Sequence, residues 1–162
     1  MYLSGRAIAP GETGHTAGRQ LLEQMYVLHI GYPMPPIAAE PRGKPYFPDG
    51  SCHFSITHTK KHVFCVLSDR PVGIDAEELD RPVRPALADK ILSEEERAQY
   101  LAAPNRDVAF LKFWVLKEAL LKCTGEGLQG YPRQTYFSLD DPRLMEMDGC
   151  VVAVIEEENY VV

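Results

Sequence analysis

The sequence lacks the long hydrophobic run that a membrane-spanning helix needs. Its longest apolar-rich stretch, residues 110–121, is interrupted by Lys112, Lys117 and Glu118, whereas a transmembrane helix needs about 20 predominantly apolar residues. The N-terminus also lacks a basic region followed by an apolar core, so the sequence predicts no secretory signal. We therefore expect a cytoplasmic protein without a membrane partner.

Cysteine is scarce, and its four copies form no CxxC pair. Because nothing else indicates secretion, we expect reduced thiols rather than disulfides. A zinc site is the alternative, and it would use donors that lie close together in the sequence: Cys52, His53, His58 and His62. The neighbouring Thr, Phe, Ile and Val favour strands and the spacing of a zinc finger is absent, so ordinary core and surface roles are preferred for these side chains.

An excess of basic residues is also lacking. Seventeen Lys and Arg stand against 23 Asp and Glu, which gives a net charge of −6, and such a chain is not expected to bind nucleic acid. Hydrophobic residues make up 45% and charged residues 25% of the 162 residues. These values are typical of a globular protein with one ordinary domain or two very small ones.

Hydrophobic periodicity and capping signals predict four helices. Residues 17–30 carry one apolar stripe. A short helix is predicted at 86–92, and Ser93 with Glu96 forms a capping box that opens another. Asn105 is the predicted N-cap of the longest helix, residues 106–123, which Gly125 ends.

Strands are predicted at 53–57, 63–67, 72–77, 135–139 and 150–155. The turn at 68–71 would join the second and third of these into a hairpin. Residues 1–14 are expected to form a loop, and 31–49, rich in proline and glycine, an irregular extended segment. Strands and helices in this mixed order predict an α+β fold in which antiparallel sheets pack with helices.

Two carboxylates follow one another at strand spacing. In a strand, Asp75 and Glu77 lie on one face and Ile74 and Ala76 on the other. A divalent cation would relieve the repulsion between the two carboxylates, and oxygen ligands suit Mg²⁺. A solvated strand end is an equally good interpretation of these six residues alone.

A third carboxylate lies within the longest helix, which is apolar nearly all round. Glu118 shares a stripe with Trp114 and Leu121, and Lys122 follows it by four residues. A buried carboxylate is unfavourable unless it is paired or coordinates a cation. The alternative is a simple surface pair between Glu118 and Lys122.

A lysine, a hydroxyl and a histidine lie upstream of these carboxylates. Lys44 precedes the predicted strand at 53–57, Thr57 is its last residue and His58 follows it. Together these side chains could bind phosphate. A packed or surface histidine is the commoner outcome for such a residue.

Taken together, four runs resemble the 4′-phosphopantetheinyl transferases of the surfactin-synthetase-activating type. They are Gly43-Lys44-Pro45, Phe54-Ser55-Ile56-Thr57-His58, Gly73-Ile74-Asp75-Ala76-Glu77 and the helix from Phe113 to Lys122, followed by Gly125-Glu126-Gly127-Leu128. The resemblance covers about half of the chain. It implies a pseudo-dimer of two α+β halves, with coenzyme A between them.

The resemblance also implies roles for individual residues. Asp75, Glu77 and Glu118 would hold Mg²⁺ at the coenzyme A pyrophosphate. Lys44, Thr57 and His58 would contact the nucleotide phosphates, and Lys122 the pyrophosphate. Asp75 and Lys122 would thus bind the cofactor, and Glu118 and Lys122 would be catalytic. The base is Glu118 or a water held by the metal.

The implied function is transfer of 4′-phosphopantetheine from coenzyme A to a serine of an apo acyl or peptidyl carrier protein. Such carriers serve fatty acid, polyketide or nonribosomal peptide synthesis, and the products are the holo carrier protein and adenosine 3′,5′-bisphosphate. The sequence divides into a reduced N-terminal half, residues 1–71, and a C-terminal half, residues 72–162. A monomer is expected. The alternative is a catalytically weak module that binds coenzyme A or a nucleotide.

The carrier protein needs a docking surface, although both proteins are acidic. The candidate is an apolar stripe beside basic residues in the segment after the Asp75 strand. It consists of Ala86, Leu87, Ile91 and Leu92 beside Arg81, Arg84 and Lys90. Ordinary core packing is the preferred interpretation of Ile91 and Leu92.

Overall fold

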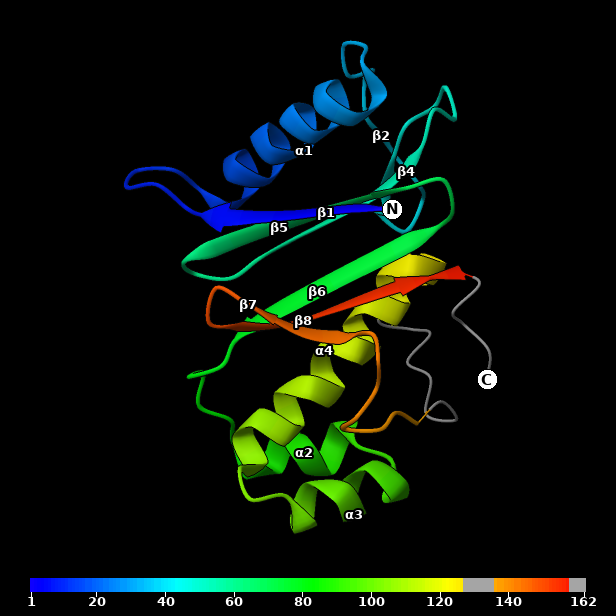
Figure 1. Cartoon of the computed structure of the whole chain (residues 1–162). Helices are drawn as coiled ribbons and strands as arrows, with labels where there is room; N and C mark the ends of the chain where they lie inside the picture. Colours follow the sequence, from blue (N-terminus) through cyan, green and yellow to red (C-terminus); the bar gives the residue numbers. More distant parts are fainter. Residues whose placement is uncertain (127–135, 158–162) are drawn as a thin grey trace.

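Two three-stranded antiparallel sheets form the centre of the protein (Figure 1). The computed structural model describes residues 1–126 and 136–157. The first sheet has the order β1-β5-β4, and the second has the order β6-β8-β7. The strands of the first sheet are β1 (Tyr2–Ala7), β4 (His53–His58) and β5 (His62–Ser68). Those of the second are β6 (Val72–Glu78), β7 (Leu144–Met147) and β8 (Cys150–Glu156).

Helices cover the outer faces of both sheets. In Figure 1, α1 (Gly14–Ile30) lies on the first sheet and α4 (Arg106–Thr124) on the second. Two shorter helices, α2 (Pro85–Ile91) and α3 (Glu94–Ala102), lie by the N-terminal end of α4. Residues 31–49 contain only the two-residue strands β2 (Ala38–Ala39) and β3 (Pro45–Tyr46), which pair with each other.

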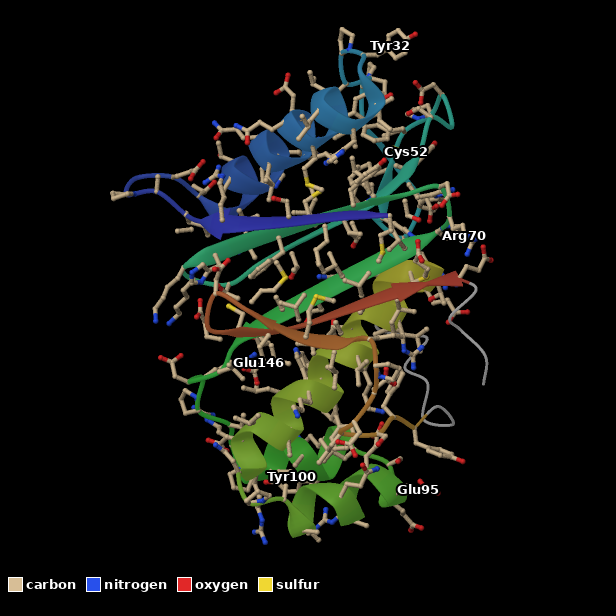
Figure 2. The ribbon with its side chains drawn as sticks, in the orientation of Figure 1. Tyr32, Cys52, Arg70, Glu95, Tyr100 and Glu146 are labelled. Carbon is tan, nitrogen blue, oxygen red and sulfur yellow. The ribbon has the colours of Figure 1, made fainter. Side chains whose placement is uncertain are left out.

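Side chains along each strand point alternately to its two faces, and the buried hydrophobic ones form three cores. Val63, Cys65 and Leu67 of β5 pack with α1. Phe64 and Val66 point the other way and meet side chains of the second sheet, among them Ile74. The third core joins α4 to the opposite face of β8 and to α2 and α3. Side chains between the sheets are drawn in Figure 2.

The α+β class and the antiparallel sheets are confirmed. So are the four predicted helices; the capping box is formed by Ser93 and Glu96, and the Asn105 side chain accepts a hydrogen bond from the Val108 backbone N–H. The four cysteines carry free thiols. Over the described residues, no helix combines the length and apolarity needed to span a membrane.

Three local predictions are wrong. Residues 2–7 form β1 rather than a loop, because they pair along the whole length of β5. That pairing, together with β4, fills both edges of β5, so β5 and β6 form no hairpin and β6 pairs with β8 instead. Of the strand predicted at 135–139, residue 135 lies outside the described residues, and residues 136–139 are not a strand.

Candidate active site

Asp75 is held at the contact between β6 and α4. Its Oδ1 accepts hydrogen bonds from Thr57 Oγ1 at 3.1 Å and from Lys122 Nζ at 2.8 Å. The same ammonium donates to the Ile74 carbonyl oxygen at 3.0 Å. Asp75 is 7% exposed, so these donors provide the pairing that a buried carboxylate requires. Thr57, expected at a nucleotide phosphate, thus also fixes an expected metal ligand.

Glu118 faces the same group of charges from α4. Its Oε1 is buried and has no hydrogen-bond partner among the described residues. Burial raises the pKa of the Glu118 carboxyl above its ordinary value, the Asp75 and Glu77 charges raise it further, and Lys122 lowers it. Burial and the two neighbouring carboxylates therefore outweigh the one ammonium that favours ionisation of Glu118.

Glu77 lies two residues beyond Asp75 on the same face of β6. It forms an ion pair with Arg81 in the turn after the strand. Burial raises the pKa of the Glu77 carboxyl, Arg81 opposes that shift, and the Asp75 charge adds to it. Asp75, Glu77 and Glu118 thus form one electrostatic group.

Gly73 lets α4 approach β6 closely enough to form this group. A Cβ at position 73 would overlap the carbonyl oxygen of Ala119 and lie 2.5 Å from the backbone nitrogen of Cys123. The helix backbone therefore packs directly on the strand at this point. Glu118 and Lys122, which flank the contact in the sequence, are brought to Asp75 as a result.

A cavity of about 280 Å³ opens beside this group, between the first sheet and α4. Its walls include Glu118 and Lys122 from α4, Ser55 from β4, and Lys44. Lys44 Nζ donates to the Cys123 carbonyl oxygen at 2.6 Å. Burial lowers the pKa of the Lys44 ammonium, although the nearby Cys123 and Glu40 raise it. Two ammonium groups and a carboxylate therefore face one cavity.

His58 is not part of that cavity. It ends β4 and lines a separate, wider depression together with Glu77 and Gly14. Gly14 begins α1, and a Cβ there would overlap the His58 ring. Lys44 and His58 thus line two different depressions, Lys44 together with Glu118 and His58 together with Glu77.

The chemistry of these residues fits a hard divalent cation. Asp75, Glu77 and Glu118 interact electrostatically, two of them have raised pKa values, and Glu118 Oε1 is buried without a partner among the described residues. The structure does not bring oxygens of all three within 4.8 Å of one another in its described part. Oxygen ligands of this kind suit Mg²⁺. Asp75, Glu77 and Glu118 are the residues that would hold it.

Lys117 is not part of this group of charges and forms a buried ion pair elsewhere. Its Nζ lies 2.9 Å from Glu96 Oε2, and the side chains are 1% and 0% exposed. Glu96 also accepts from the backbone N–H groups of Ser93 and Phe137. The pair therefore ties α3 and α4 to the segment before β7, although Lys117 lies in the same sequence motif as Glu118.

Sequence reasoning missed several of these contacts. The capping box identified Glu96 but gave no sign of its pairing with Lys117, 21 residues later. Ser55 Oγ accepts a hydrogen bond from the Ile74 backbone N–H at 3.1 Å, which joins β4 to β6 between the two sheets. Only the strand alternation of 53–57 hinted that Ser55 and Thr57 share a face.

The structure does not form the zinc site considered in the sequence, with Cys52, His53, His58 and His62 as its donors. His53 and His58 lie at opposite ends of β4, because an extended strand separates them. Cys52, labelled in Figure 2, packs with the core beneath α1. His62 belongs to another group of side chains, with Glu78 and Cys150.

Comparison with known families gives a clear match. The profile described as "4'-phosphopantetheinyl transferase superfamily" matches residues 71–157. The match covers β6, α4 and β8 and therefore contains Asp75, Glu77, Glu118 and Lys122.

Individual relatives agree. The chain is 34% identical over 120 residues to the 4'-phosphopantetheinyl transferase psf-1 of Bacillus pumilus, covering 71% of this chain and 49% of the relative. It is 34% identical over 89 residues to Sfp of Bacillus subtilis, covering 53% and 39%. It is 31% identical over 124 residues to HetI of a Nostoc species, covering 70% and 52%. The chain thus spans about half of the length of these relatives, or less.

Proposed function

The chain belongs to the 4′-phosphopantetheinyl transferase superfamily, and from that premise we propose that it transfers 4′-phosphopantetheine from coenzyme A to a serine of an apo carrier protein. The observation that carries the proposal is the buried, unpartnered Oε1 of Glu118, which lies with Asp75 and Glu77 beside a cavity that also contains Lys44 and Lys122. Such a group suits a reaction at a polyanionic phosphate.

The reaction forms a bond between the serine Oγ and the phosphorus next to pantetheine. It breaks the bond from that phosphorus to the bridging oxygen, which leaves on adenosine 3′,5′-bisphosphate. Mg²⁺, bound by Asp75, Glu77 and Glu118, would neutralise charge on the pyrophosphate.

The side chains of the protein supply the remaining functions. Lys122 Nζ is fixed by Asp75 Oδ1 and the Ile74 carbonyl oxygen, so it can meet negative charge on the phosphate with little reorganisation. Glu118, or a water held by the metal, is the proposed acceptor of the serine proton. Lys44, whose ammonium faces the cavity, is the proposed contact to the nucleotide. His58, at the edge of the neighbouring depression, is the proposed contact to the 3′-phosphate.

The carrier protein is proposed to dock beside α2. A depression of about 430 Å³ there is lined by Leu87 together with Arg81, Arg84 and Lys90. Ile91 and Leu92 pack against the core around α4, in line with the interpretation preferred for them, whereas Arg84 and Lys90 are exposed. Basic residues around an apolar depression would suit the acidic surface of a carrier protein.

The direct test incubates the full chain with coenzyme A, Mg²⁺ and a panel of apo carrier proteins, followed by intact mass. At least one carrier should gain one phosphopantetheine group, and the same carrier with its serine replaced by alanine should gain none. If the chain binds coenzyme A, as judged by calorimetry, but modifies no carrier, the alternative of a binding module is correct and the transferase proposal fails.

A further inference from the structure

Three different donor types converge at one end of the space between the two sheets. His62 Nδ1 lies 3.2 Å from Glu78 Oε1 and 3.7 Å from Cys150 Sγ. The three donor atoms all lie within 4.8 Å of one another. They come from β5, β6 and β8, so both sheets contribute to the group.

This group is distinct from the carboxylates at α4. In a strand, neighbouring side chains point to opposite faces. Cys150 therefore belongs to the core between the sheets, with Phe64 and Ile74, whereas Glu77 lies on the other face of β6. Glu78 follows Glu77 directly and points away from it, toward His62.

Two of the three donor separations fit the edges of a tetrahedral zinc site. Bonds of about 2.3 Å from zinc to sulfur and 2.0–2.1 Å from zinc to nitrogen or oxygen place nitrogen and oxygen about 3.3 Å apart, and nitrogen and sulfur about 3.6 Å apart. The observed separations are 3.2 Å and 3.7 Å. The third separation, between the Glu78 and Cys150 donors, is within 4.8 Å.

The surroundings orient one donor and oppose ionisation of another, because burial and the Glu78 charge raise the pKa of the Cys150 thiol to about 12. Thr59 Oγ1 donates to Glu78 Oε1 at 2.5 Å and so orients that carboxylate. The His62 and Glu78 side chains are 18% and 14% exposed, and Glu78 and Thr59 line a depression. Cys150 is fully buried, so an ion would have to enter past His62 and Glu78. A thiolate, a carboxylate and a neutral imidazole would offset both charges of a divalent ion.

From this convergence we propose that His62, Glu78 and Cys150 form a second metal site, which binds Zn²⁺ through Nδ1, a carboxylate oxygen and Sγ and leaves the fourth position to water. The thiol loses its proton on binding. Sulfur and imidazole ligands select zinc over Mg²⁺, so this site and the carboxylate group take different ions. Because the ligands come from both sheets, bound Zn²⁺ would clamp residues 1–71 to residues 72–162.

Co²⁺ is the probe, because thiolate coordination gives it an intense ligand-to-metal charge-transfer absorption. The full chain, reduced with a phosphine and freed of metal, is titrated with Co²⁺. The expected result is one equivalent bound with a thiolate band that Zn²⁺ abolishes and Mg²⁺ does not. Cys150→Ser should remove the band, and Cys52→Ser, the matched control, should keep it.

A second pair of variants keeps the test decisive if Cys150→Ser fails to fold. His62→Gln should weaken Co²⁺ binding at least tenfold, and Zn²⁺ should no longer raise its Tm. His53→Gln, which alters the exposed histidine at the far end of β4, should behave like the parent. The proposal is overturned by a parent without a thiolate band, by a band that survives in Cys150→Ser, or by His62→Gln binding Co²⁺ as tightly as the parent.

Discussion

The Glu118 carboxylate ionises in a place where its Oε1 meets no hydrogen-bond donor within the described part of the chain. A buried acceptor without a partner destabilises a protein by about 1–3 kcal/mol. Asp75 and Glu77 add like charge, which raises the pKa of Glu118. Glu118 therefore does not stabilise the fold, which is consistent with the proposal that it is a ligand for a cation.

Glu118→Gln removes a half-buried negative charge that lies beside two other carboxylates, so it should raise the free energy of unfolding at neutral pH in EDTA. The raised pKa fixes the sign of its pH dependence. The parent is destabilised by ionisation above the folded-state pKa, and this penalty vanishes below the ordinary carboxyl pKa, where both states are protonated. The advantage of the variant should therefore shrink as the pH falls toward that value. Urea unfolding across pH measures it, and a variant less stable than the parent at neutral pH contradicts the account.

Lys44 permits a test of where the nucleotide lies. Lys44→Ala removes a half-buried ammonium from the cavity, and a hydrogen bond to a charged group contributes about 1.5–3 kcal/mol. The KM for coenzyme A should rise roughly tenfold to a hundredfold, with a smaller change in kcat. Arg19→Ala, on the exposed side of α1, is the control and should leave both constants unchanged. An unaltered KM in Lys44→Ala would place the nucleotide elsewhere.

At the scale of elements, the contact of α4 with β6 positions the charged residues. Gly73→Ala would force the helix away from the strand, and overpacking of this kind destabilises by about 1–3 kcal/mol or more. Transfer should also be lost, because Glu118 and Lys122 move relative to Asp75.

Ile74→Val provides the comparison, since it alters the opposite face of the same strand. It should destabilise by about 0.5–1.5 kcal/mol while transfer continues at the parental rate. Thermal unfolding and initial rates measure both effects. A Gly73→Ala variant with the Tm and rate of the parent would show that the close approach is dispensable.

The elements were predictable to different degrees for physical reasons. Helix α4 has a local signature, since Asn105 caps its first turn and Gly125 ends it in a left-handed conformation with φ 73°. The turn at 68–71 correctly indicated that the chain reverses but could not tell which strands pair. Strand β5 pairs with β1, about 60 residues earlier, and such a partner is chosen by the packing of whole faces rather than by local sequence.

The features of the candidate site were also predictable from the sequence to different degrees. Strand alternation predicted that Asp75 and Glu77 share a face, and Glu118 stood out as a carboxylate in an apolar helix. Their convergence with Lys122 was implied only by the family resemblance, because it depends on how α4 packs on β6. The pairing of Lys117 with Glu96 joins elements with no pattern in common, so nothing local indicated it.

At the scale of the whole molecule, the acidic net charge of −6 means that the proposed acidic carrier protein would have to be recognised by a local surface. Arg84→Glu combined with Lys90→Glu reverses two exposed charges beside α2. Charges at the rim of an interface act mainly on the association rate and its salt dependence. The double variant should therefore use carrier protein with kcat/KM lowered at least tenfold, with unchanged coenzyme A affinity.

Added salt should slow the parent more than this double variant. Initial rates at several salt concentrations measure the difference, and calorimetry with coenzyme A is the control. Parental rates in the double variant at every salt concentration would show that the carrier protein docks on another surface.

We propose that phosphopantetheine transfer depends on a cation held by the carboxylates between β6 and α4. The most direct test of this claim is the initial rate of holo carrier formation as a function of Mg²⁺ concentration. The rate should saturate with Mg²⁺ in the parent and in Glu23→Gln, an exposed control on α1. In Glu118→Gln and Asp75→Asn it should fall about a hundredfold or more, with both variants folded. A parental rate in either variant, or full activity of the parent in excess EDTA, would contradict the claim.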